Sequence, residues 1–185
     1  TPILTGELYQ PLAGSRVPFV AVGLQAGDSK QRLAVGEEPV QYRFLTWRAN
    51  LDLGLALGRW GEARVGYRHH ETQGRAFGER SSGVPRFDRK ESGLGAIVIF
   101  DQLDRINFPR QGLLAVADYH EARTALGADE AYRRLDLQTV AAATTGRHSV
   151  IALAHGRTAL GGELPPSEWT SVGGLFNLSG LPPGE

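Results

Sequence analysis

The sequence contains no cysteine and no methionine, and it has no excess of charge of either sign. Without cysteine, neither a disulfide nor a thiolate metal site can form. The 20 Lys and Arg residues balance the 20 Asp and Glu residues, so a nucleic-acid partner, which usually requires a basic excess, is not expected. The absence of methionine even at position 1 predicts a mature segment or a fragment, which we treat as one domain over 1–185.

Long hydrophobic runs are also missing. No apolar stretch approaches the roughly 18–20 residues that a membrane-spanning helix needs. The hydrophobic fraction is 41% and the mean hydropathy is −0.24. A soluble β domain would have such values, and so would a barrel whose strands alternate lipid-facing and lumen-facing residues. Composition alone therefore leaves both classes open.

The clearest pattern in the chain is an alternation of apolar and polar residues between Gln41 and Gly58. Because successive side chains of a strand point to opposite faces, this period of two predicts a strand with one apolar and one polar face. The polar set comprises Arg48, Asn50 and Asp52. The apolar set comprises Leu45, Trp47, Ala49, Leu51, Leu53, Leu55 and Leu57.

Similar alternation recurs along the chain and predicts further strands near residues 4–12, 20–25, 63–68, 94–100, 113–119, 135–143 and 150–154. In two of these segments, Leu135 and Leu137 extend the apolar set, while the polar set gains Arg64, Arg68, Arg134, Asp136 and Gln138, with Arg157 as a further candidate. The expected connections alternate in length. The short ones lie near Ala13–Pro18, Gly58–Gly61, Gln102–Gln111 and Thr145–Arg147, and the long ones near Asp28–Pro39, Thr72–Ser92, Arg123–Ala131 and Gly161–Thr170.

Strand length, face segregation and loop alternation together predict an all-β fold, an antiparallel up-and-down transmembrane β-barrel. An Arg on the lipid side would cost about 2–4 kcal/mol at mid-depth, so the polar set is expected to face the lumen and the apolar set the lipid. The lumen charges either form cross-strand ion pairs that fill and stiffen the interior or line a hydrated conduit. Trp60, Tyr119 and Trp169 near strand ends fit an interfacial aromatic girdle or ordinary packing beside turns.

The sequence offers little for catalysis or metal binding. Adjacent His69 and His70 would point to opposite faces of a strand and could not chelate one ion. His120 and His155 are expected to be isolated histidines at loop edges. The Gly-x-Ser-x-Gly elbow of patatin-like lipases does not occur. We therefore predict no catalytic residue, no metal site, no cofactor and no enzyme activity for this chain.

Two short stretches resemble a known family. Asp101 and Asp104, followed by Phe108, Pro109 and Gly112, resemble the D-x-x-D…F-P-x-x-G hairpin of the bacterial surface antigen D15 family, the barrel of the Omp85 superfamily. A C-terminal run resembles the corresponding segment of barrels fused to patatin-like phospholipases. It comprises Gly173, Gly174, Phe176, Leu178, Ser179, Gly180, Pro183 and Gly184. The chain stops before the Arg-Gly-Tyr-type motif that follows in other members of the superfamily.

The resemblance implies a type V secretion protein, similar to an autotransporter, in the bacterial outer membrane. In such proteins a barrel of about sixteen strands anchors a passenger domain of the same polypeptide and helps to translocate it, and this chain would supply about half of the strands. The implied partners are outer-membrane lipids and the passenger, and homo-oligomerisation stays open. Two alternatives remain: an Omp85-type factor for outer-membrane protein assembly and insertion, and a soluble β-barrel or sandwich that binds a ligand.

Overall fold

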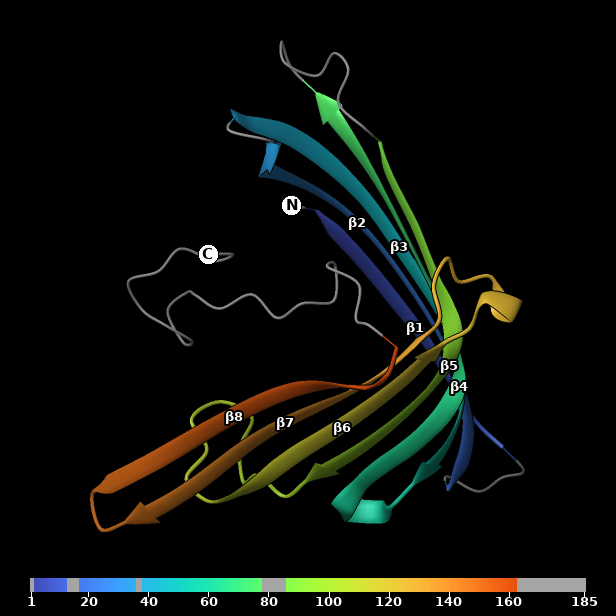
Figure 1. Cartoon of the computed structure of the whole chain (residues 1–185). Helices are drawn as coiled ribbons and strands as arrows, with labels where there is room; N and C mark the ends of the chain where they lie inside the picture. The colour runs from blue at the N-terminus through green and yellow to red at the C-terminus, as the bar shows by residue number, and fades with distance from the viewer. Residues whose placement is uncertain (1, 13–16, 36–37, 78–85, 163–185) are drawn as a thin grey trace.

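The computed structural model describes residues 2–12, 17–35, 38–77 and 86–162, with side chains from 31 to 39 left out (Figure 1). The described residues form eight strands and two short 3-10 turns, and they include no α-helix. The strands are β1 (Ile3–Pro11), β2 (Pro18–Val35), β3 (Glu38–Ala56), β4 (Gly61–Phe77), β5 (Phe87–Asp101), β6 (Gly112–Ala122), β7 (Tyr132–Thr145) and β8 (His148–Gly161). The 3-10 turns are η1 (Gly58–Trp60) and η2 (Thr124–Leu126).

All eight strands belong to one sheet, in the order β1-β2-β3-β4-β5-β6-β7-β8, and each pairs antiparallel with its neighbours in sequence. This is the up-and-down topology that the alternating segments predicted, and the all-β prediction is confirmed. The sheet is open in the described residues, with β1 and β8 at its two edges (Figure 1).

The strands run further than the sequence predicted. The segment Asp28–Pro39, expected to be a long loop, is mostly a ladder that continues from Asp28 opposite Leu45 to Val35 opposite Glu38. Likewise β4 continues to Phe77 and β5 begins at Phe87, inside the expected loop Thr72–Ser92. The first predicted loop is reduced to residues 36–37 and the second to residues 78–86, so the predicted bounds of both were too wide. Backbone pairing continues wherever two antiparallel chains stay in register, whether or not their side chains alternate.

The predicted alternation of loop lengths was also wrong as stated. Residues 36–37 alone separate β2 from β3, whereas residues 102–111 separate β5 from β6. Tight turns were predicted at Gly58–Gly61 and at Thr145–Arg147, and both are present. Gly58, Gly61 and Gly146 adopt positive φ angles there, which favour glycine. We call the end of the sheet with the β3–β4 turn the η1 end, and the end with the β6–β7 connection the η2 end.

Glycines allow the sheet to bend around β4 and β5. Figure 1 shows β1–β3 and β6–β8 running in different directions on either side of these two strands. On the side that becomes concave, Gly66 lies directly opposite Gly95. A Cβ atom at Gly95 would overlap the Arg68 side chain, and one at Gly66 would overlap Asp52. The missing side chains leave room for long polar side chains to cross the concave face.

The two faces of the sheet differ in character along every strand. Leu51, Leu53 and Leu55 of β3 expose 54%, 61% and 52% of their surface, whereas the intervening Asp52 exposes 5%. A soluble protein would bury the leucines and expose the carboxylate. This sheet does the reverse, so its apolar side is the uncovered one.

Candidate functional site: a charged concave face and an uncharged outer band

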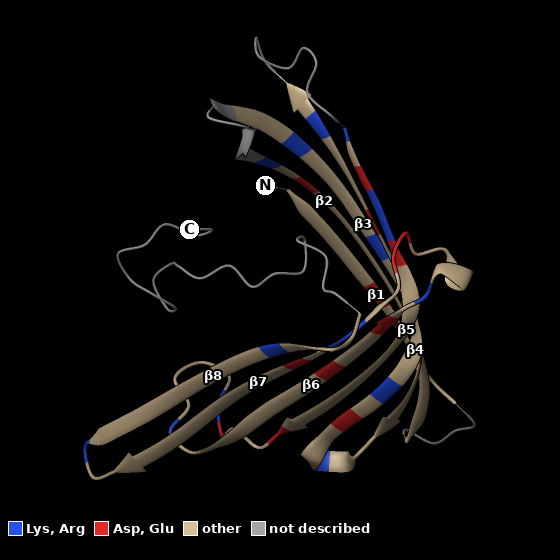
Figure 2. Cartoon of the chain, in the orientation of Figure 1, with Lys and Arg blue, Asp and Glu red and all other residues tan. Residues whose placement is uncertain are grey.

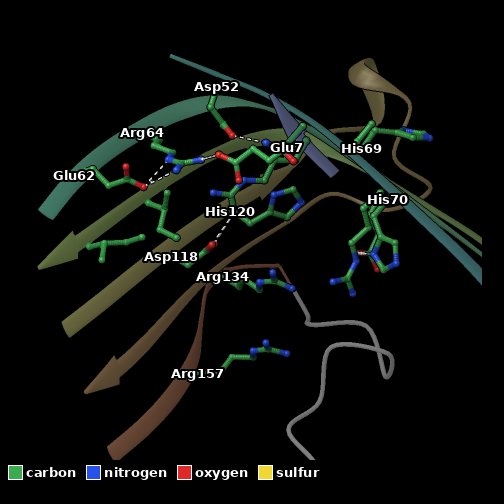
Figure 3. Close-up of a pocket in the computed structure, with 17 residues that line it drawn as sticks. Glu7, Asp52, Glu62, Arg64, His69, His70, Asp118, His120, Arg134 and Arg157 are labelled. Atoms are coloured by element: carbon green, nitrogen blue, oxygen red, sulfur yellow. Dashed lines mark hydrogen bonds and ion pairs between the residues drawn. The ribbon is translucent and has the colours of Figure 1, made fainter. Parts of the chain in front are cut away.

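All polar residues predicted to share a face do so. Arg48, Asn50 and Asp52 of β3 lie in register with Arg64 and Arg68 of β4 and, across β5 and β6, with Arg134, Asp136 and Gln138 of β7. We call this the charged face, and Figure 2 shows where acidic and basic residues lie along the strands. Six of these eight residues, all except Asp136 and Gln138, line a cavity of about 660 Å³, which is also lined by Glu7, Glu62, Glu91, Asp118, His120 and Arg157 (Figure 3).

Arg64 joins two strands that are not neighbours. Its guanidinium donates to Glu62 on the same strand at 2.7 Å and to Glu7 of β1 at 3.0 Å. Because β2 and β3 lie between β1 and β4, the contact with Glu7 spans the concave face rather than following a ladder (Figure 3). The Arg64 side chain also lies over the Phe19 ring, 5.3 Å from its centroid. Arg64 therefore ties the first strand to the middle of the sheet.

A second bridge crosses β5. The Arg68 guanidinium of β4 donates to both carboxylate oxygens of Asp118 on β6, at 2.7 and 2.9 Å. Between these strands lies Gly95, and its missing side chain leaves the space through which Arg68 passes. The pairing of Arg with Asp that the sequence suggested is present here, but it skips a strand.

Two guanidinium groups and one histidine ring surround Asp136 of β7. Arg157 of β8 donates to it at 2.6 Å, Arg134 on its own strand lies at 3.0 Å, and His155 lies at 3.7 Å. Asp136 exposes 6% of its surface, so its charge is compensated by partners rather than by water. His155 was predicted to be isolated, and that prediction was wrong.

The Glu91 carboxylate is the centre of a fourth polar group, nearer the η2 end. It accepts hydrogen bonds from Arg89 at 2.8 Å and from the Tyr132 hydroxyl of β7 at 3.1 Å, and the His70 ring lies 3.5 Å away. Nearby, His120 exposes only 5% of its surface and packs 5.9 Å from the Tyr132 ring. His120 is thus a buried residue of the charged face, and its prediction as a loop-edge histidine was wrong.

His69 and His70 lie on opposite faces of β4, as predicted from their adjacency. The Nδ1 atom of His69 lies 2.7 Å from the Ser92 hydroxyl, and its Nε2 atom lies 4.0 Å from Glu71. A catalytic serine needs access to substrate and a hydrogen-bonded base. Ser92 is fully buried, packs beside Gly127 after η2 and accepts the Arg123 N–H at its carbonyl oxygen at 3.0 Å, so Ser92 holds the η2 connection against β5.

The opposite face carries the second element of the candidate site, which we call the uncharged band. The predicted apolar residues Leu45, Trp47, Leu51, Leu53, Leu55, Leu57, Leu135 and Leu137 all belong to it, with Leu57 just past the end of β3. The band continues over the other strands. It includes Leu8, Val22, Leu24, Val65, Tyr67, Leu94, Ala96, Val98, Leu113, Ala115, Ala117, Tyr119, Thr139, Ala141, Val150, Ala152 and Ala154.

A register row across this band shows how completely charge is excluded. From β2 to β8 the row reads Val20, Leu53, Val65, Ala96, Tyr119, Leu135 and Thr158. Towards the η2 end, charges return to this face beyond the band, where Arg43 pairs with Asp28 at 2.6 Å and Glu71 lies opposite Lys90.

Aromatic side chains mark both limits of the band. Trp60 lies in η1, stacks on Phe100 at 5.7 Å and has the Arg59 guanidinium 5.1 Å from its ring. Towards the η2 end, Tyr119 is the last band residue of β6, and its hydroxyl donates to Glu121 at 3.2 Å. Aromatic rings with one apolar and one polar contact are typical of residues at the interface between an apolar phase and water. The predicted Trp169 lies outside the described residues.

The hairpin motif forms a well-bonded turn between β5 and β6. Asp101 accepts a hydrogen bond from the Leu103 N–H at 3.0 Å, and Asp104 accepts from the Arg110 and Gln111 N–H groups at 2.9 and 3.2 Å. Phe108 has a φ of 56° and exposes 86% of its surface, while the adjacent Pro109 is buried. Gly112 has a φ of 112°, and a Cβ atom there would overlap the Gln102 carbonyl.

The two acidic residues of this motif therefore bond to backbone groups of their own turn, as expected for a structural hairpin. The second motif, which comprises Gly173, Gly174, Phe176, Leu178, Ser179, Gly180, Pro183 and Gly184, lies outside the described residues.

No protein-family model matches the chain, and no curated protein matches it. In the part of the chain that the structure describes, no helix is both long and apolar enough to cross a membrane.

Proposed function

We propose that this chain forms part of the wall of a transmembrane β-barrel in a bacterial outer membrane. The uncharged band would face lipid and the charged face would line the lumen. Within that barrel its role is to anchor a passenger domain of the same polypeptide, a patatin-like lipase, in the membrane and to help translocate it. The lipase would supply any covalent chemistry.

The observation that carries the proposal is the uncovered, uncharged band across the whole width of the sheet. Leu53, at the centre of the band, exposes 61% of its surface. Burial of apolar surface yields roughly 25 cal/mol per Å², so a monomeric soluble protein rarely leaves so large a contiguous patch uncovered. Hydrocarbon would cover it on every strand at once.

Strand lengths fit the same proposal. A tilted strand needs about 9–11 residues to cross a bilayer, and the described strands have 9 to 19. The longest strands, β2 and β3, extend past the band at the η2 end, where Arg43 and Asp28 form an ion pair. Outer-membrane barrels extend on their extracellular side and close with turns on their periplasmic side, so the η2 end is expected outside the cell.

The choice of passenger depends on the resemblance in sequence. An Omp85-superfamily barrel of the patatin-fused branch is favoured by two sequence features. They are Asp101, Asp104 and Gly112 of the hairpin motif, and the C-terminal run. An Omp85-type assembly factor would share this barrel wall. The domain encoded upstream separates the two, because a Gly-x-Ser-x-Gly elbow and serial periplasmic repeats are readily told apart.

The test is to express the complete gene that contains this chain in a Gram-negative host. We expect the protein to fractionate with outer membranes and to migrate faster on gels before boiling than after. The variants Leu137→Arg and Gln138→Arg provide a matched pair, since these neighbours on β7 face opposite sides. Leu137→Arg should block assembly and Gln138→Arg should not. Equal behaviour of the two variants, or migration unchanged by boiling, would refute the proposal.

A soluble ligand-binding domain is the rival that this experiment also tests. In that case the band would be covered by another part of the protein, and the wild type would be recovered without detergent.

A further inference from the structure

At the η2 end of the sheet, the uncharged band ends in a compact ionic group formed by Glu121, Arg123 and Arg133, here called the Glu121 cluster. Glu121 and Arg133 are directly opposite each other on β6 and β7. One carboxylate oxygen of Glu121 lies 3.0 Å from Arg123 and 3.2 Å from Arg133. The Tyr119 hydroxyl donates to the other oxygen at 3.2 Å.

The cluster has cationic capacity left over. Two guanidinium groups share one carboxylate, so the cluster has a net charge of about +1. Each guanidinium has five N–H donors in a planar fork, and the contacts with Glu121 use few of them. The side chains of Arg123 and Arg133 expose 50% and 56% of their surface, so the remaining donors are open to a ligand.

The surroundings of the cluster indicate what kind of ligand fits. A cavity of about 320 Å³ lies beside it, lined by Arg123, Tyr132, Arg133 and Gly161 among others. On the same face, Leu94 of the uncharged band lies directly opposite Glu121, and the next band residues along β6 and β7 are Tyr119 and Leu135. A ligand here would meet guanidinium donors at one end and an apolar wall at the other.

Phosphate is the group that best matches paired guanidiniums, because Arg binds its oxygens with two parallel N–H bonds. A free phosphate ion would use the arginines but would gain nothing from the adjoining apolar wall. We propose that the Glu121 cluster binds the phosphate of a membrane lipid whose acyl chains lie along the uncharged band. This inference rests on the proposed membrane location and adds a specific lipid contact at its extracellular boundary.

The experiment uses the protein purified from outer membranes in a neutral detergent, with lipid retention measured by native mass spectrometry. The probes are lipid A with its two phosphates, lipid A from which they have been removed, and inorganic phosphate. The wild type should retain the phosphorylated lipid about tenfold more strongly than the dephosphorylated one. Equal retention of the two lipids would overturn the inference, and so would inorganic phosphate binding as tightly as the phosphorylated lipid.

The double variant Arg123→Gln with Arg133→Gln should lose that tenfold preference. Its matched control is Arg59→Gln with Arg147→Gln, which removes two arginines from the turns at the η1 end and should keep the preference. Unchanged retention in the cluster variant would overturn the inference.

Glu121→Gln provides an independent readout that keeps both arginines. It raises the net charge of the cluster by one, so the phosphorylated lipid should bind more tightly, and weaker binding would count against the site. Failure of the wild type to reach the membrane would instead refute the proposed function. A membrane-inserted protein whose lipid preference ignores these arginines would refute only the lipid site.

Discussion

Leu53→Arg is the substitution that separates the proposed membrane location most directly from any alternative. Leu53 lies at the centre of the uncharged band, with Val20 of β2 and Val65 of β4 directly opposite it. None of these neighbours can neutralise a guanidinium. An Arg at the mid-plane of a bilayer costs about 2–4 kcal/mol, which lowers the ratio of folded to unfolded protein by about 30- to 700-fold.

Leu→Arg substitutions at other depths in the bilayer test whether the free-energy cost varies with depth as expected. The cost of an Arg falls to about 0–1 kcal/mol near the interfaces. Leu57 lies just beyond β3, next to η1, and Leu45 lies opposite Asp28, at the other limit of the band. Leu57→Arg and Leu45→Arg should therefore cost much less than Leu53→Arg. Asp52→Asn, on the opposite face, should leave assembly intact, because an amide oxygen can still accept the hydrogen bond from Asn50.

The assay is urea-dependent folding of each variant into phosphatidylcholine vesicles, monitored by tryptophan fluorescence. Trp47 and Trp60 expose 46% and 47% of their surface, so insertion into lipid should shift their emission to shorter wavelength. A cost that peaks at Leu53 and declines towards Leu45 and Leu57 is the expected profile. A flat profile, or a Leu53→Arg variant that folds as well as Asp52→Asn, would refute the assignment of this face to lipid.

Three further predictions concern contacts that the fold creates. Gly95→Ala should destabilise the protein by about 1–3 kcal/mol in urea unfolding, because the new Cβ atom displaces Arg68. Arg64→Gln should speed amide exchange in β1 by up to about fivefold, because the bridge to Glu7 is partly exposed. The backbone N–H groups of Arg110 and Gln111 hold the pKa of the Asp104 carboxyl below its ordinary value of 3.8. Since this folded-state pKa is depressed, Asp104 stabilises its turn above the unfolded pKa and loses that effect as pH falls through the folded pKa, which NMR titration can follow.

Each of these predictions has an outcome that contradicts it. Gly156→Ala is the control for the first, since nothing lies within 4 Å of its added Cβ. If Gly95→Ala lowers the free energy of unfolding no more than Gly156→Ala does, Arg68 can move aside without a loss of stability. Unchanged β1 exchange in Arg64→Gln, with Arg147→Gln as control, would mean that the ladder alone holds the edge strand. A carboxyl of Asp104 that titrates at or above 3.8 would mean that its turn bonds do not persist in solution.

The segregation of faces was predictable from the sequence because it is a local property. Alternate side chains of a strand point to opposite sides, so Leu51 and Asp52 must separate once the segment is extended. The tight turns at Gly58 and Gly146 were predictable for the same reason, since a positive φ is a property of single residues. No such local signal marks where a ladder ends, which is why the extension of β2 to Val35 and of β4 to Phe77 was not foreseen.

Which charged side chains meet depends on the tertiary structure and not on the local sequence. Glu7 and Arg64 are separated by 57 residues and Arg68 and Asp118 by 50, and neither pair lies on adjacent strands. Their contact depends on the bend of the sheet and on the space beside Gly95, which are set by all the strands together. His120 is buried for the same reason, because β7 brings Tyr132 beside it. A one-dimensional pattern of period two specifies the face of a residue, but the curvature of the whole sheet selects its partner.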